Sequence, residues 1–170
     1  ALSSEANENI WLLKDPCHIA HIEEILNVYP KARFIFLHRN PRFSMPSISN
    51  LAFNLRLGYS NHVDPILVGN QMLSYWQDAT EKLLNGRELI PKGQMIDLQF
   101  NHLIDDPIKI TNQIFEKFSI KHDEAFERKL TTRIGTKKLK SKHSYSYEKF
   151  FRASGEVENK FVNYISYFDL

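Results

Sequence analysis

The stretch Arg33-Phe34-Ile35-Phe36-Leu37-His38-Arg39-Asn40-Pro41 indicates the fold class of this chain. Its apolar centre is typical of a buried strand, which the last three residues end. Upstream, Ile10-Trp11-Leu12-Leu13 has the pattern of another short buried strand, ending at Lys14. Residues 18–28 between the two strands carry apolar side chains at helical spacing, and Pro30 stops that helix. Strand, helix and strand with short connections make a βαβ unit, so we predict an α/β fold with a parallel sheet flanked by helices.

The rest of the chain alternates predicted helices with one more strand. Asp106 before Pro107 is a typical N-cap followed by proline at the first helical position. Asn85-Gly86 ends the long helix that precedes it. The chain shows no internal repeat, and we expect a single domain over residues 1–170. The expected helices cover residues 42–57, 65–84, 107–118, 123–132 and 155–168, the third strand covers 94–98, and loops cover 58–64 and 136–147.

The composition disfavours several classes of protein. A net charge of +2 over 170 residues is too small for a general nucleic-acid binder unless it is clustered. No apolar run approaches the roughly 18 residues of a membrane span, and no Cys/His cluster has metal-ligand spacing, so we expect neither a span nor a metal. The single cysteine, Cys17, allows no intrachain disulfide. With no signal peptide visible at the start, the compartment stays open, with the cytoplasm slightly favoured.

Basic residues stand at the ends of both predicted N-terminal strands. Ligands of parallel α/β sheets gather beyond the carboxyl ends of the strands, where Lys14 and the pair His38-Arg39 lie. The guanidinium of Arg39 can hold a phosphate by its fork of donors, and Ser47 in the next helix can add a hydroxyl to the same anion. The alternative is that Arg39 is a surface residue and Ser47 an ordinary helix residue.

Two blocks of sequence resemble the sulfotransferase superfamily. They are Trp11-Leu12-Leu13-Lys14-Asp15-Pro16-Cys17-His18 and, after a helix, Tyr29-Pro30 continuing through the strand to His38-Arg39-Asn40-Pro41. The resemblance implies a P-loop-NTPase-like fold and a sulfuryl donor, 3'-phosphoadenosine-5'-phosphosulfate (PAPS), which leaves as 3'-phosphoadenosine-5'-phosphate (PAP). In that superfamily the arginine that ends the second strand, and a serine eight residues on, bind the 3'-phosphate. Arg39 and Ser47 match that spacing.

Two later blocks are similar to the same family. Phe100-Asn101-His102-Leu103-Ile104-Asp105-Asp106-Pro107 resembles its strand-to-helix segment, with Phe100 where many members have a tyrosine against the adenine. The resemblance therefore implies that Phe100 keeps the ring contact without the hydroxyl. The loop Lys140-Ser141-Lys142-His143 resembles a basic segment that closes over the 3'-phosphate, which makes Lys140, Lys142 and His143 candidate donor ligands. A solvated basic loop is the alternative.

The family's phosphate loop has no counterpart here. Such loops direct backbone N–H groups at the 5'-phosphosulfate, but all six glycines of this chain lie at or after Gly58. We therefore expect the chain to correspond to the C-terminal two-thirds of a sulfotransferase, without its first strand and phosphate loop. An upstream segment carrying that loop is an expected partner.

Sulfuryl transfer requires a cation at the sulfate and a base at the acceptor. Lys14 matches the family's strand-end lysine and is the candidate cation, the alternative being a lysine that faces solvent. His18 is the candidate base because histidine titrates near neutrality, although His21, His38 or the missing segment could supply this group. The acceptor is a hydroxyl or amine of a small molecule, a carbohydrate or a peptide. His62 and Asp64 lie in a region that resembles the family's acceptor side, with a polar surface loop as the alternative.

Two other functions compete with sulfuryl transfer. A non-catalytic binding or scaffold domain could have kept this fold, in line with the changes at Phe100, Asn101 and His102. A nucleotide-dependent kinase would need a phosphate loop and a Mg²⁺ carboxylate, and neither is visible. The three functions differ in the ligand expected. A sulfotransferase binds the 3'-phosphorylated nucleotide, a scaffold domain binds no nucleotide, and a kinase binds Mg-ATP.

Overall fold

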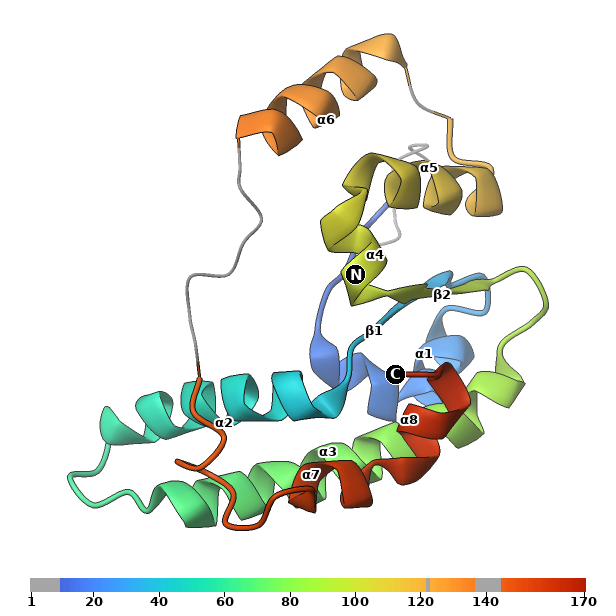
Figure 1. Cartoon of the computed structure of the whole chain (residues 1–170). Helices are drawn as coiled ribbons and strands as arrows, with labels where there is room; N and C mark the ends of the chain where they lie inside the picture. The colour runs from blue at the N-terminus through green and yellow to red at the C-terminus, as the bar shows by residue number, and fades with distance from the viewer. Residues whose placement is uncertain (1–9, 122, 137–144) are drawn as a thin grey trace.

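A parallel sheet lies at the centre of the molecule (Figure 1). The computed structural model describes residues 10–121, 123–136 and 145–170. Within these residues two strands, β1 (Phe34–His38) and β2 (Met95–Gln99), pair in parallel. The helices α2 (Pro41–Leu57) and α3 (Pro65–Gly86) connect the strands and pack against each other. The predicted α/β class with a parallel sheet flanked by helices is therefore confirmed.

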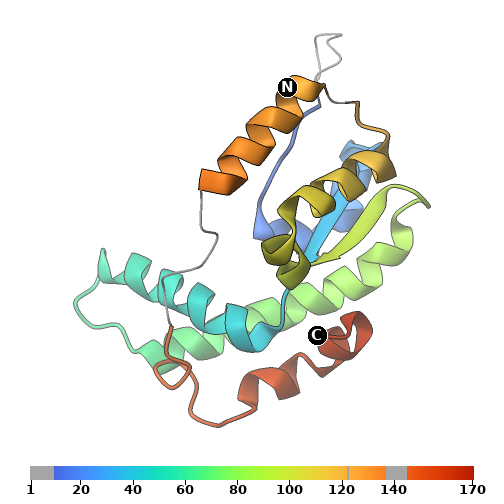
Figure 2. The same ribbon diagram turned by 45° about the horizontal axis from the view of Figure 1, so that its top comes forward.

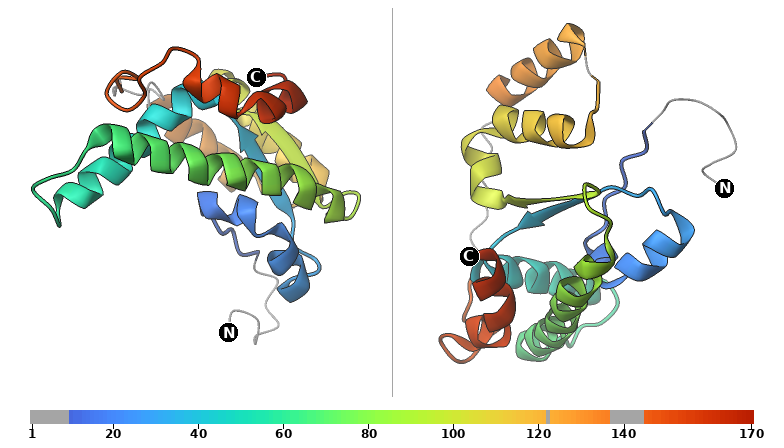
Figure 3. Two further views of the ribbon diagram at one scale, coloured as in Figure 1. Left: turned by 90° about the horizontal axis from the view of Figure 1, so that it is seen from below. Right: turned by 90° about the vertical axis from the view of Figure 1, so that its right-hand side faces the viewer.

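Helices lie on both sides of this sheet. In Figures 1 and 3, α4 and α5 lie on one side of the strands, and α3 and α8 lie on the other. Figure 2 shows α6 beyond α5, on the outside of the molecule. The shorter elements are η1 (Pro16–Ala20), α1 (Ile22–Val28), η2 (Arg87–Leu89), α4 (Phe100–Asp105), α5 (Pro107–Phe118), α6 (Glu124–Thr136), α7 (Glu156–Lys160) and α8 (Val162–Phe168).

The register of the two strands sets the position of the residues that follow them. Phe36 and His38 are buried on the same face of β1, from which His38 contacts Tyr164 of α8, and the rings of Phe34, Phe36 and His38 stack along the strand. At the carboxyl edge His38 pairs with Gln99. Parallel strands end at the same edge of a sheet, so the next residues, Arg39 and Phe100, leave the sheet side by side.

The starts of the long helices follow local sequence signals. Asp64 caps α3 by accepting a hydrogen bond from the Ile66 N–H, and Asp106 caps α5 by accepting one from the Lys109 N–H. In both helices a proline follows the cap, where its missing N–H costs no hydrogen bond. The predicted helix starts are therefore confirmed.

The expected N-terminal strand is wrong. Residues 10–13 form no strand, and their side chains are exposed, Leu12 by 82%. A strand requires a hydrogen-bonded neighbour, and within the described residues β1 pairs with β2 alone. The two parallel strands are therefore β1 and β2, connected through α2 and α3, and the βαβ unit expected at the start of the chain is not formed.

Other differences concern element boundaries. The helix expected over residues 18–28 is divided at His21 into η1 and α1, and the last helix is divided at Phe161 into α7 and α8. Helix α4 was not predicted, and α6 continues to Thr136, beyond its predicted end at residue 132. Of the loop expected over residues 136–147, residues 137–144 lie outside the described part of the chain. Gly86 ends α3 with an ordinary φ of −68°, and its missing Cβ leaves room for Ile22.

The C-terminal part of the chain completes the core. Phe150 and Phe151 are fully buried and cluster with residues of α2, α3 and α7. This packing requires a close approach at Gly69 of α3, because a Cβ there would stand 2.2 Å from the carbonyl oxygen of Phe150. The segment that precedes α7 thus fits against a bare stretch of helix backbone.

We expect Gly69→Ala to destabilise the protein by about 1–3 kcal/mol, because the methyl group would push the Phe150 backbone away. Asn70→Ala is the matched control, since Asn70 is an exposed neighbour on the same helix and alanine favours helices. Urea unfolding measures both changes. Equal stability of the two variants would contradict the close contact.

Candidate functional site

An arginine and an aromatic ring meet where the two strands end. The guanidinium carbon of Arg39 lies 4.5 Å from the centroid of the Phe100 ring, a cation–π distance. Arg39 is exposed, and within the described residues it has no carboxylate partner. The ring contact does not occupy the guanidinium N–H donors, so Arg39 can still bind an anion at this edge.

The neighbouring arginine of α2 is already neutralised. Arg42 forms an ion pair with Glu158 of α7, and its guanidinium also lies over the ring of Tyr147. The carboxylate raises the pKa of Arg42 through this hydrogen bond and its charge. Arg39 is therefore the arginine at the start of α2 that is available to a ligand.

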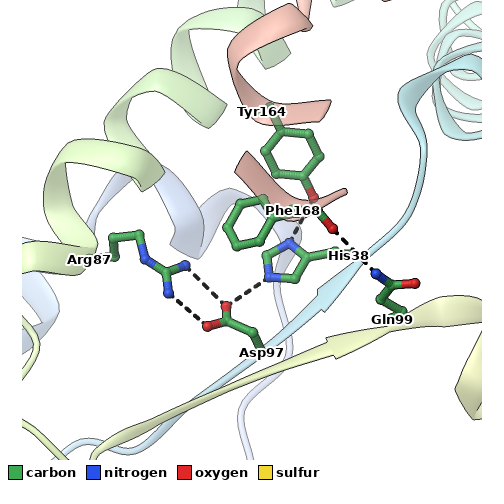
Figure 4. A network of polar contacts seen from close by, with 6 residues as sticks. All are labelled: His38, Arg87, Asp97, Gln99, Tyr164 and Phe168. Carbon is green, nitrogen blue, oxygen red and sulfur yellow. Dashed lines mark hydrogen bonds and ion pairs between the residues drawn. The ribbon is translucent and has the colours of Figure 1, made fainter. Parts of the chain in front are cut away.

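A polar network, buried except at Asp97, lies behind this edge (Figure 4). Arg87 of η2 donates two hydrogen bonds to Asp97 of β2, at 3.1 Å from Nη1 to Oδ1 and 2.7 Å from Nη2 to Oδ2. His38 of β1 contacts the same carboxylate, with Nε2 2.8 Å from Oδ1. The other ring nitrogen of His38, Nδ1, lies 2.9 Å from the Tyr164 hydroxyl of α8.

Aromatic rings enclose the network on the side of α8. The Phe168 ring stacks on His38 with 3.6 Å between the ring centroids, and His38 is only 3% exposed. Phe168 and Tyr167 also lie against the Arg87 guanidinium, at 5.1 and 5.0 Å. The carbonyl of Phe168 accepts a hydrogen bond of 3.3 Å from the Gln99 side chain. Helix α8 therefore contacts the last residue of each strand (Figure 4).

The network shifts the pKa values of its members. Burial alone would raise the pKa of Asp97, but hydrogen bonds from His38 and Arg87 and the charge of Arg87 hold it well below its usual range. Burial raises the pKa of Tyr164 well above its ordinary value, and a hydrogen bond from the backbone N–H of Arg39 partly opposes this. Asp97 is thus an anion, and Tyr164 a neutral hydroxyl, at any physiological pH.

The structure describes some of the sequence-predicted site residues and not others. Arg39 and Phe100 are brought together, while Ser47 lies half-buried in the second turn of α2. Lys14 is exposed just before η1, and His18 lies within η1, which packs against α3. Lys140, Lys142 and His143 lie outside the described residues.

Sequence reasoning missed most of the buried network. It named His38 only as a basic strand-end residue and alternative base, and it assigned no role to Tyr164, Asp97 or Arg87. One signal was present: Asp97 is a charged residue in the middle of a short, otherwise largely apolar strand. A carboxylate there requires a buried cation, and Arg87 is the nearest upstream arginine in the sequence.

His62 and Asp64 lie apart from the strand edge. They line a cavity of about 290 Å³ at the turn between α2 and α3, together with Arg56 and Tyr59. Seventeen residues of α2 separate this turn from Arg39, which corresponds to about 25 Å of helix. The cavity and the Arg39–Phe100 pair are therefore two separate places on the molecule.

The comparisons with known proteins agree with this geometry. A profile of the sulfotransferase family matches residues 2–124, most of the chain. The chain belongs to the sulfotransferase family. Among its relatives are the omega-hydroxy-beta-dihydromenaquinone-9 sulfotransferases Stf3 of Mycobacterium bovis and Mycobacterium tuberculosis. Each is 29% identical over 119 residues, which is 68% of this chain and 30% of the relative.

Solved sulfotransferase structures show the same fold. STF9 from Mycobacterium avium superposes with a TM-score of 0.80 at 22% identity, over 94% of this chain and 42% of that one. STF1 from Mycobacterium tuberculosis gives 0.77 at 23% identity, over 90% and 39%. The P-loop-like sulfotransferase fold predicted for the chain is confirmed. The chain spans about a third of the length of the curated relatives it matches.

No helix among the described residues is long and apolar enough to cross a membrane. Nor do they contain a group of three or more His, Cys, Asp or Glu side chains that could hold a metal ion.

We expect Asp97→Asn to destabilise the fold at neutral pH by about 2 kcal/mol or more, because buried Arg87 loses its counter-charge. The folded pKa of Asp97 lies below its unfolded value. Its contribution is therefore complete above the unfolded pKa of about 3.9, and it disappears as the pH falls through the lower folded pKa. The difference between wild type and variant should shrink below about pH 4.

Urea unfolding at each pH measures this difference. Asp105→Asn is the control, because Asp105 is exposed at the end of α4. A wild-type advantage that persists undiminished in strong acid would contradict the buried ion pair.

Proposed function

We propose that this chain is the part of a PAPS-dependent sulfotransferase that binds the 3'-phosphate and adenine of the donor. The contact between Arg39 and Phe100 carries this proposal. Family membership gives the reaction class, and the resemblance at these two positions assigns Arg39 to the 3'-phosphate and Phe100 to the adenine. The two residues lie side by side at the carboxyl edge of the parallel strands, where ligands of α/β folds bind.

The start of α2 supports the anion assignment. Asn40 caps this helix by accepting a hydrogen bond from the Arg42 N–H, and Pro41 occupies the first helical position. The helix N-terminus contributes a partial positive charge beside Arg39. Ser47 lies six residues into α2, about 9 Å along its axis, and we assign its hydroxyl to the same phosphate. Lys140, Lys142 and His143 stay predicted ligands on the strength of the family resemblance.

Lys14 and His18 are the proposed catalytic residues. In-line transfer places negative charge on the sulfuryl oxygens, which a nearby ammonium group stabilises. Lys14 is exposed and lies two residues before the start of η1, so its side chain can reach a ligand. His18 lies one 3-10 turn later and would accept the acceptor proton as the sulfuryl group moves to the acceptor oxygen.

We further propose that an upstream segment completes the fold with a strand and a phosphate loop. The exposed apolar residues 10–13 support this, as do Ile35 and Leu37 of β1, which are 39% and 43% exposed. Apolar side chains of a strand are normally covered in a parallel sheet. The added segment would cover them and hold the 5'-phosphosulfate through its backbone N–H groups.

The acceptor is proposed as a hydroxyl-bearing small molecule. Two relatives are named for omega-hydroxy-beta-dihydromenaquinone-9, a molecule of that kind. Carbohydrate and peptide acceptors are the alternatives, and they are compared with small molecules in the rate measurement described below. The scaffold and kinase alternatives are distinguished by the nucleotide experiment that follows.

We expect PAP to raise the melting temperature of the protein by several degrees, whereas AMP and Mg-ATP should have little effect, because Arg39 recognises the 3'-phosphate. The measurement is a thermal shift on the chain alone and on the chain preceded by its upstream segment. Arg39→Ala should weaken PAP binding by about 2–4 kcal/mol through loss of a charged hydrogen-bond partner.

Arg152→Ala is the control for that substitution, since Arg152 is exposed and lies on the segment before α7. A shift with Mg-ATP alone would favour the kinase. No shift with any nucleotide would favour the scaffold, and an unchanged PAP affinity in Arg39→Ala would remove Arg39 from the site.

We expect Lys14→Met to lower the rate of PAPS conversion to PAP by about a hundredfold or more while leaving PAP affinity nearly unchanged, because the lysine acts on the sulfuryl group. His18→Asn should lower the same rate through loss of the base. The rate is measured with a panel of small-molecule, carbohydrate and peptide acceptors. Lys31→Met is the control, because Lys31 is exposed and is assigned no role in the site, and a rate equal to that of this control in either test variant would refute that variant's assignment.

A further inference from the structure

Helix α8 contacts the carboxyl ends of both strands, next to the proposed donor site. The strand-end residues His38 and Gln99 pair in register, and Arg39 and Phe100 follow them directly. Tyr164 reaches His38 through its hydroxyl, and the Phe168 carbonyl accepts a hydrogen bond from Gln99. The two residues of the proposed donor site are therefore each one position away from a residue held by α8 (Figure 4).

The hydrogen bonds of His38 can be satisfied in one consistent direction. The Tyr164 hydroxyl can donate its proton to Nδ1 of His38, 2.9 Å away. His38 would in turn carry its proton on Nε2 and donate it to Asp97. Donors and acceptors thus match along the whole chain of contacts, from Tyr164 to Asp97.

Burial makes this arrangement stiff. His38 is 3% exposed and Tyr164 is 9% exposed, so water cannot replace a broken hydrogen bond there. The Phe168 ring lies flat on the imidazole, with 20° between the ring planes, and blocks its rotation. A displacement of α8 would therefore leave buried polar atoms unpaired, at a cost that holds the ends of both strands in one position.

We propose that α8 positions the donor site, with Tyr164 and Phe168 holding Arg39 and Phe100 in their binding geometry through His38 and Gln99. This inference rests on the proposed function of Arg39. Tyr164 and Phe168 are positioning residues, because they act through the strand ends and are assigned no contact with the nucleotide. An arginine held in place loses less conformational entropy when a phosphate binds, which raises affinity without a new contact.

The test is a double-mutant cycle between Tyr164 and Arg39, measured by calorimetry on the protein at its natural length. Tyr164→Phe should weaken PAP binding by about three- to tenfold, the effect of one hydrogen bond, and weaken AMP binding less. In the Arg39→Ala background the same substitution should change PAP affinity by less than about twofold, because the residue that it positions is gone.

Tyr167→Phe is the matched control, since it removes an exposed hydroxyl from the same helix, and it should leave PAP affinity unchanged. A purely structural role would lower the melting temperature of Tyr164→Phe and leave PAP affinity at the wild-type value, which would overturn the inference. An equal loss with and without Arg39 would also overturn it.

Gln99→Ala tests the same coupling from the other strand should Tyr164→Phe fail to fold. It removes the hydrogen bond to the Phe168 carbonyl and should weaken PAP binding in the same direction. Unchanged affinity in that variant would overturn the inference. A wild-type protein that binds PAP and AMP equally would overturn the proposed function itself, and with it this proposal.

Discussion

The structure depends on one charge in the central sheet, the carboxylate of Asp97. Its side chain is 33% exposed, and withdrawing part of a carboxylate from water costs free energy unless cations and donors replace the lost hydration. Arg87 and His38 supply these groups from η2 and β1. Tyr164 then satisfies the far side of the imidazole from α8. Because the four groups come from four different elements, satisfying one carboxylate fixes the mutual positions of a connecting turn, both strands and the C-terminal helix.

Local features of the fold could be predicted from the sequence, and features that join distant segments could not. Asp64-Pro65 and Asp106-Pro107 mark helix starts because the cap and the proline act on their own turn. Residues 10–13 have the pattern of a strand, yet a pattern cannot show which neighbour will pair with it. The contact between His38 and Tyr164 spans 126 residues and leaves no local trace. Tyr164 therefore resembles any other core aromatic residue in the sequence.

The candidate site divides in the same way. Arg39 follows from its place after a buried strand, whereas Phe100 rests on resemblance to the family. Their contact at 4.5 Å depends on the register of β1 and β2, which only the structure shows. The structure also distinguishes Arg39, which is available to a ligand, from Arg42, three residues later, because Glu158 neutralises Arg42. Equal residue types at helical spacing thus take different roles according to a partner more than a hundred residues away.

The close approach at Gly69 has a consequence for how the protein is made. Phe150 and Phe151 fill the core against α3, and Tyr164 closes the buried network. A ribosome synthesises these residues after both strands and the long helices have emerged. The earlier segments therefore wait in the cell with an apolar surface, and with the Nδ1 atom of His38 still lacking its Tyr164 partner, until the last helices are made. During that interval the nascent chain is a natural client for chaperones that hold apolar segments apart.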